Sequence, residues 1–200
     1  MARGKFITIY GVNNMGKSTH AHILVRRLEE EGYKAKYVKY PVYDIEPTGP
    51  FLDRVLRGGE QKISEDELQL WFILNRYQFQ PQLEKWLEEG YIVVAEDYVG
   101  TGMAWGMTKG LTEEWLEQAN KFLMKEDLGI MIEGERVKSA IEDGHVHEQH
   151  DDLIERCYKN FQYLAGKEGW DCVVLQPQKA QTAELIWGEV SKFLNDVRDR

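Results

Sequence analysis

The chain has 200 residues, of which 42% are hydrophobic, and it carries a formal net charge of −9. This length suits a single domain over residues 1–200 with a substantial core, and the ordinary apolar content argues against disorder. The acidity disfavours a protein that coats nucleic acid, but a mononucleotide needs only a local positive pocket. There are two cysteines without a Cys-x-x-Cys pair, and no stretch resembles a signal peptide or a membrane span. We therefore expect a cytoplasmic protein without a membrane or nucleic-acid partner.

Five short apolar runs along the chain predict β-strands. They lie at residues 6–10, 34–39, 91–95, 128–132 and 172–175. Segments with helical spacing separate them, and strands that alternate with helices imply a parallel sheet. We predict an α/β fold in which five parallel strands carry helices on both faces.

Three of the predicted helices have clear boundary signals. The first begins at Lys17 and closes at Gly32, because glycine favours the left-handed turn that ends a helix. A capping box at 64–67 opens a long helix that reaches Gly90, and Pro81 should bend it or split it in two. The last helix is expected from about residue 182 to 197.

The loop between the first strand and the first helix carries a phosphate-binding motif. Gly11-Val-Asn-Asn-Met-Gly-Lys-Ser-Thr19 has the full Walker A spacing, and its strand–loop–helix context argues against a chance match. The glycines let the backbone wrap around phosphate oxygens, Lys17 can reach the β- and γ-phosphates, and the Ser18 hydroxyl can hold Mg²⁺. We predict ATP phosphate contacts at Gly11, Asn13, Asn14, Met15, Gly16, Lys17, Ser18 and Thr19.

Two acidic residues, Glu96 and Asp97, end the third strand beside the expected phosphate site. Acidic residues at this position orient Mg²⁺ through water in P-loop enzymes, and the alternative is a pair of solvated acids. We predict that both act in catalysis with Lys17, and we assign the metal to Ser18 and Asp97.

Several further motifs, taken in their order, resemble the thymidylate kinase family of P-loop nucleoside monophosphate kinases. They are Tyr40-Pro41 followed by Pro47-Thr48-Gly49, Trp71-Phe72-Ile73-Leu74-Asn75-Arg76, and Glu96-Asp97-Tyr98-x-x-Thr101-Gly102-x-Ala104-Trp105. Residues 135–150 stand where that family has a short mobile lid. The resemblance covers most of the chain, and it implies the P-loop NTPase fold, ATP as the phosphate donor with Mg²⁺, and a homodimer.

The resemblance also implies roles for individual residues. Phe72 would stack on the acceptor base, Arg76 would hydrogen-bond its edge, and Trp105 would crowd the sugar and disfavour a ribose 2′-hydroxyl. A core position is the alternative for Phe72 and Trp105, and it is preferred for Trp71. The implied acceptor site comprises Phe72, Arg76, Tyr98, Thr101, Gly102 and Trp105, and the implied donor-base contacts are Gln178 and Lys179.

The sequence departs from the family pattern at the arginines that grip phosphate. Asp97 stands where the family usually has one such arginine, the loop at 42–44 lacks another, and the lid stretch 142–150 contains none. At least one of Arg54, Arg57, Arg76 and Arg136 is expected to replace them, with Arg136 also a catalytic candidate. His145, His147 and His150 lack the spacing of a zinc site, although a protonated histidine can partly replace a lid arginine.

These features predict transfer of the ATP γ-phosphate to a deoxynucleoside monophosphate, with dTMP as the favoured acceptor. A deoxynucleoside kinase is the second reading, because a nucleoside brings no phosphate to grip. A third is a nucleotide-binding sensor or partner protein with little turnover.

Overall fold

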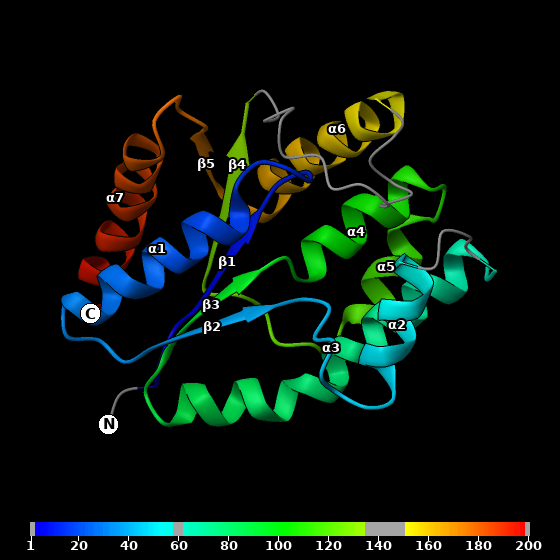
Figure 1. The fold of residues 1–200 in the computed structure, drawn as a ribbon, viewed down its shortest axis with the longest axis horizontal. Helices are drawn as coiled ribbons and strands as arrows, with labels where there is room; N and C mark the ends of the chain where they lie inside the picture. Colours follow the sequence, from blue (N-terminus) through cyan, green and yellow to red (C-terminus); the bar gives the residue numbers. More distant parts are fainter. Residues whose placement is uncertain (1–2, 58–61, 135–150, 199–200) are drawn as a thin grey trace.

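The computed structural model describes residues 3–57, 62–134 and 151–198 (Figure 1). The elements follow in chain order as β1 (Phe6–Tyr10), α1 (Lys17–Glu30), β2 (Ala35–Lys39), α2 (Thr48–Arg57), α3 (Glu65–Glu88), β3 (Ile92–Glu96), α4 (Val99–Thr108), α5 (Glu113–Asn120), β4 (Leu128–Glu133), α6 (Asp151–Glu168), β5 (Asp171–Val174) and α7 (Lys179–Arg198). The expected lid, 135–150, lies outside the described residues.

The strands form one parallel sheet in the order β2-β3-β1-β4-β5, which confirms the predicted fold class. The strand β1 is central, and its five residues are all buried, as expected for a strand covered on both faces. The register sets Glu96 on β3 beside Ile9 on β1 and beside Lys39 on β2. The ends of these three strands therefore meet at the edge from which the phosphate loop departs.

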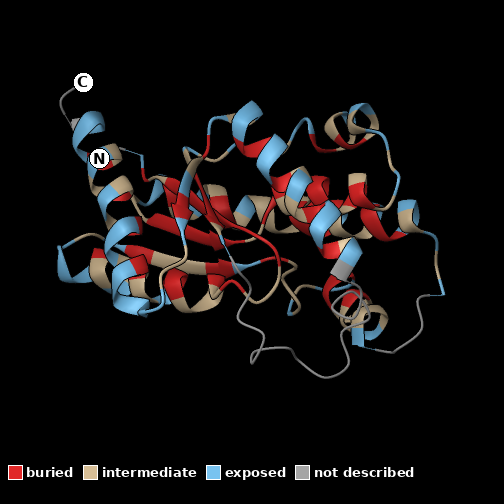
Figure 2. Cartoon of the chain, turned by 90° about the horizontal axis from the view of Figure 1, so that it is seen from above, coloured by how far each residue is buried: buried red, intermediate tan, exposed pale blue. Residues whose placement is uncertain are grey.

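Helices cover both faces of the sheet (Figure 1). The helices α1 and α7 pack together on one face, and α3, α4 and α6 lie over the other. The buried residues gather on the sheet and on the inward sides of the helices, as the colouring of Figure 2 shows. None of the described helices combines the length and the apolar character needed to cross a membrane.

The helix α3 is continuous through Pro81, so the proline does not split it. The Ser64 side chain caps its start by accepting a hydrogen bond from the Glu67 amide, as the sequence predicts. Pro81 is exposed, while Leu83 and Leu87 after it are fully buried. Burial of these leucines holds the last turns in place despite the missing backbone hydrogen bond.

Candidate active site

The phosphate loop wraps tightly because its backbone adopts conformations that favour glycine. Gly11 has φ 142°, and a Cβ there would lie 2.8 Å from the carbonyl oxygen of Ile132 on the neighbouring strand. Gly16 caps α1 with φ 76°, and Asn14 is also left-handed with φ 67°. The Met15 side chain is fully buried, so this residue can offer a phosphate only its backbone amide. The loop thus forms a cradle at the N-terminus of α1, where anions bind favourably.

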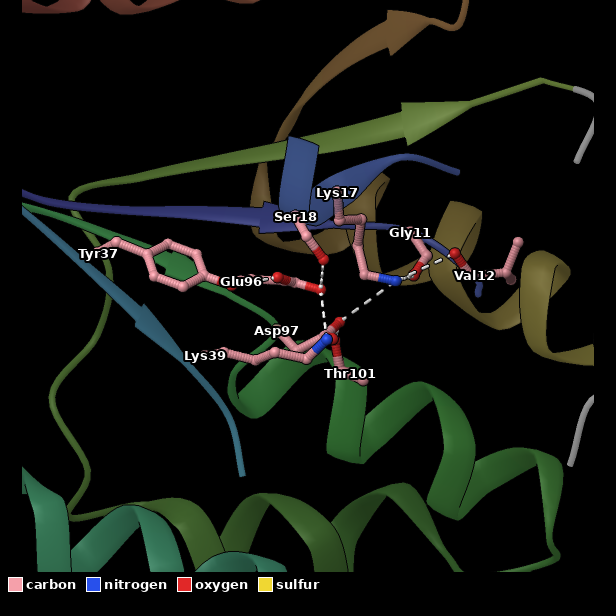
Figure 3. A network of polar contacts seen from close by, with 9 residues as sticks. All are labelled: Gly11, Val12, Lys17, Ser18, Tyr37, Lys39, Glu96, Asp97 and Thr101. Carbon is pink, nitrogen blue, oxygen red and sulfur yellow. Dashed lines mark hydrogen bonds and ion pairs between the residues drawn. The ribbon is translucent and has the colours of Figure 1, made fainter. Parts of the chain in front are cut away.

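The Lys17 ammonium lies inside this loop (Figure 3). It donates to the carbonyl oxygens of Gly11 at 2.9 Å and Val12 at 3.1 Å, and its side chain is only 6% exposed. It also forms an ion pair of 3.7 Å with Asp97. Lys17 is therefore positioned at the loop interior, where a bound triphosphate would meet it.

Glu96 is buried at the end of β3 and collects three partners (Figure 3). It accepts hydrogen bonds from the Ser18 hydroxyl at 2.8 Å and from the Tyr37 hydroxyl, and it pairs with Lys39 at 3.0 Å. Burial alone would raise the pKa of Glu96, but Lys39 and the two hydroxyl donors outweigh it and hold the pKa below its ordinary value. Glu96 is therefore a carboxylate at neutral pH.

Asp97, the next residue, makes different contacts. Its backbone is left-handed with φ 62°, which is uncommon for a residue other than glycine and is found at functional sites. Its carboxylate accepts a hydrogen bond of 2.8 Å from Thr101 on α4 and faces Lys17. Burial raises the pKa of Asp97 despite the opposing Lys17 charge. The direct contact with Ser18 belongs to Glu96, whereas the sequence assigned the metal to Asp97.

Sequence reasoning missed Tyr37 and Lys39, the two residues of β2 that contact Glu96. They are two positions apart and so lie on the same side of the strand. The signal available in the sequence was this spacing at the end of a predicted strand.

Arg76 on α3 lies against α4. Its guanidinium donates to the Asn120 side chain at 3.1 Å, and a Cβ added to Gly102 would lie 3.0 Å from it. Arg76 is 4% exposed, and its Nε has no hydrogen-bond partner among the described residues. Burial lowers the pKa of Arg76 to about 10, so the group remains charged at neutral pH. The structure thus brings together Arg76 and Gly102, two predicted acceptor residues.

The tryptophan and phenylalanine residues singled out in the sequence are all partly buried. Phe72 and Trp105 are both half-buried. Trp71 stacks on Phe51 with ring centres 4.0 Å apart, in keeping with its expected structural role.

Tyr98, a residue of the predicted acceptor site, is buried in the core, and its acceptor role stays a prediction. It is 1% exposed, and its ring packs against Phe6 and Tyr40, each with centroids 5.0 Å away. Its hydroxyl donates to the Met124 carbonyl at 3.0 Å. Tyr98 follows the end of β3 by two residues, and its side chain packs inward against these two rings.

The turn that precedes α7 lies near the start of α1. Gln178 and Lys179 are exposed, and burial together with the Lys179 charge lowers the pKa of His20 on α1. His20 itself packs near Gly16, since a Cβ there would be 3.5 Å from its ring. The predicted donor-base residues therefore neighbour the phosphate loop.

Two of the arginines that were predicted to bind the acceptor phosphate, Arg54 and Arg57, contact residues of their own helix and of the loop before it. Arg57 pairs with Asp53 at 2.7 Å and lies over the Tyr43 ring, and Arg54 lies 6.0 Å from the Phe51 ring centre. Both arginines are exposed. Arg136 and the lid residues His145, His147 and His150 lie outside the described residues.

The structure has the features of a P-loop nucleotide-binding protein. They are a parallel sheet with a glycine-rich loop after its central strand, a buried lysine in that loop, and an acid beside the loop serine. Comparison with known proteins narrows this class. The family model described as thymidylate kinase matches residues 9–186, and the chain belongs to that family.

Individual relatives agree with the family assignment. The chain is 27% identical to the thymidylate kinase of Schizosaccharomyces pombe over 200 residues, covering 98% of this chain and 93% of the relative. It is 27% identical to the thymidylate kinase of Homo sapiens over 165 residues, covering 81% and 77%. The solved structure of thymidylate kinase from Candida albicans has the same fold, with a TM-score of 0.81 at 22% identity over 96% of this chain and 94% of that one.

Proposed function

We propose that this protein transfers the γ-phosphate of ATP to dTMP, giving ADP and dTDP. The observation that carries the proposal is the position of Asp97, which contacts Lys17 of the phosphate loop at 3.7 Å and Thr101 of α4 at 2.8 Å. One side chain thus joins the donor loop to the helix that carries Gly102 and Trp105. Phosphoryl transfer depends on such positioning of donor and acceptor.

The phosphate loop supplies the donor site. Backbone amides of residues 11–19 and the Lys17 ammonium would hold the triphosphate, and Lys17 would stabilise charge that develops on the transferred group. Gln178 and Lys179 would border the adenine, since their turn lies beside the start of α1.

The residues around Ser18 fit a Mg²⁺ ion. The Ser18 hydroxyl is a hard oxygen ligand of the kind that Mg²⁺ prefers, and the Glu96 carboxylate lies 2.8 Å from it, where it could accept a hydrogen bond from a metal-bound water. Among the described residues no three His, Cys, Asp or Glu side chains converge on one point, as suits an ion that takes most of its ligands from ATP and water. When bound, Mg²⁺ would neutralise phosphate charge, with Glu96 orienting its water.

The helices α3 and α4 would supply the acceptor site. Phe72 would stack on the base, Arg76 would donate to its edge, and Trp105 would lie against the sugar. The Arg76 Nε–H group has no hydrogen-bond partner in the described part of the chain, which supports a role for Arg76 in binding the acceptor base. Gly102 leaves room for the guanidinium, because a Cβ there would lie only 3.0 Å from it and the guanidinium would have to shift.

A homodimer through α3 is part of the proposal. Leu70 and Leu74 are 49% and 45% exposed and lie one turn apart on this helix. A second copy of the chain would cover them. Light scattering of the purified protein tests this, and replacement of both leucines by Gln should yield monomers.

The proposed reaction is tested by incubating the purified protein with ATP, Mg²⁺ and one acceptor at a time, and separating the products by chromatography. We expect equal amounts of ADP and dTDP from dTMP. Phosphorylation of thymidine but not dTMP would replace the proposal with a deoxynucleoside kinase. Binding of ATP without turnover of any acceptor would favour a sensor.

A further inference from the structure

A bound acceptor monophosphate brings a second group of negative charges next to the ATP phosphates, and it needs cationic partners. In the described part of the chain, the contacts of Glu96 and Asp97 reach two cations, Lys17 and Lys39 (Figure 3). Lys17 is enclosed by the phosphate loop and serves the donor. The second cation, Lys39, pairs with Glu96 and lies on β2, outside the phosphate loop.

We propose that Lys39 binds the phosphate of the acceptor nucleotide. This inference rests on the proposed dTMP kinase function and names a residue that holds the substrate in that reaction. Lys39 ends β2, at the sheet edge where β1 and β3 also end, and its Nζ lies 3.0 Å from Glu96. Its position thus places an ammonium group beside the donor site.

Lys39 is accessible to a ligand, because its side chain is 48% exposed while that of Glu96 is 4% exposed. An ammonium group has three hydrogen-bond donors, and the contact with Glu96 needs only one of them. The remaining donors can meet phosphate oxygens without breaking the ion pair.

Two of the arginines that the sequence nominated, Arg76 and Arg57, fit this task less well. Arg76 is 4% exposed and already donates to Asn120. Arg57 is held by Asp53. Lys39 therefore combines the accessibility and the position that an incoming phosphate requires.

Three variants separate phosphate binding from a structural role. Lys39→Gln removes the charge, and Lys39→Arg keeps it. Lys36→Gln is the matched control, because Lys36 lies on the opposite side of the same strand, where it contacts the rings of Trp86 and Tyr91. Calorimetry measures the Kd of dTMP and of thymidine for each variant, and steady-state kinetics give the KM of dTMP and of ATP.

We expect Lys39→Gln to raise the Kd and KM of dTMP on the order of tenfold, as loss of a hydrogen bond to a charged group does. The Kd of thymidine and the KM of ATP should stay close to those of the unmodified protein. Lys39→Arg should restore dTMP affinity, and Lys36→Gln should change neither ligand.

An equal loss of affinity for dTMP and thymidine in Lys39→Gln would overturn the inference, because it would show a general defect of the site. Unchanged dTMP binding would overturn it as well. Both outcomes leave dTMP turnover by the unmodified protein intact, whereas absence of that turnover would overturn the proposed function and this inference with it. The ratio of the two affinities is taken within each variant, so partial loss of folded protein does not alter it.

Discussion

The Ser18 hydroxyl donates a 2.8 Å hydrogen bond to the Glu96 carboxylate. It joins the first turn of α1 to the end of β3, and Asp97 contacts Lys17 from the next position. Two adjacent acids thus serve different parts of the phosphate loop. This separation makes their roles distinguishable by mutation.

Glu96→Gln should raise the Mg²⁺ concentration needed for half-maximal activity by about 10- to 100-fold, the usual cost of losing an outer-shell partner of a metal. Asp97→Asn should change this concentration much less, because Asp97 faces Lys17. Titration of activity with Mg²⁺ at saturating ATP checks both variants. A larger increase of this Mg²⁺ concentration in Asp97→Asn than in Glu96→Gln would assign the metal to Asp97.

Lys17→Ala should lower kcat by at least about 10²-fold, because its charge is aimed at the phosphate that is transferred. The fold should survive, since the hydrogen bonds and the ion pair of the lysine within the described residues go to loop carbonyls and to Asp97. Lys192→Ala, at an exposed position of α7, is the control. Turnover of Lys17→Ala at the level of the unmodified protein, with an intact circular dichroism spectrum, would contradict the assignment.

The enzyme should prefer dTMP to its ribose counterpart, because Trp105 is proposed to lie against the sugar. We expect a kcat/KM ratio of at least about tenfold, within the range that a pocket achieves against one added hydroxyl. Trp105→Ala should bring the ratio toward one, while Trp115→Ala on α5 should preserve it. Equal kcat/KM values in the unmodified protein would show that Trp105 faces elsewhere.

Stability should depend on the protonation of Glu126. Burial raises the pKa of Glu126 above its ordinary value of 4.5, and its carboxylate accepts a 2.8 Å hydrogen bond from the Tyr10 hydroxyl. A raised carboxyl pKa means that the folded state holds its proton longer than the unfolded chain, so this contribution is fully present below pH 4.5 and is lost as the pH rises through the folded pKa.

The variant Glu126→Gln should therefore lose less stability than the unmodified protein as the pH rises from 4.5 toward neutrality. Its amide oxygen can still accept from Tyr10. Thermal unfolding across this range measures the difference, with the exposed Glu114→Gln as control. Parallel curves of Tm against pH for Glu126→Gln and the unmodified protein would contradict it.

The phosphate loop could be predicted because its spacing follows from how a backbone encloses phosphate. The central strands β1 and β3 could be predicted because they are buried and apolar along almost their whole length, whereas the edge strands β2 and β5 show shorter apolar runs. The lateral pairing of Lys39 with Glu96 was not predictable, since strand order is a tertiary property. The left-handed backbone of Asp97 was not predictable either, because residues other than glycine adopt it rarely. The burial of Tyr98 depends on packing against Phe6 and Tyr40, which lie far from it in the sequence.

The central position of β1 has a consequence for hydrogen exchange. Its residues are buried and paired with β3 and β4, so their amides should exchange with solvent only when the whole protein unfolds. The strands β2 and β5 form the edges of the sheet, so their amides should exchange sooner. The phosphate loop therefore follows the strand that should exchange last, whereas Lys39 ends an edge strand that should exchange earlier.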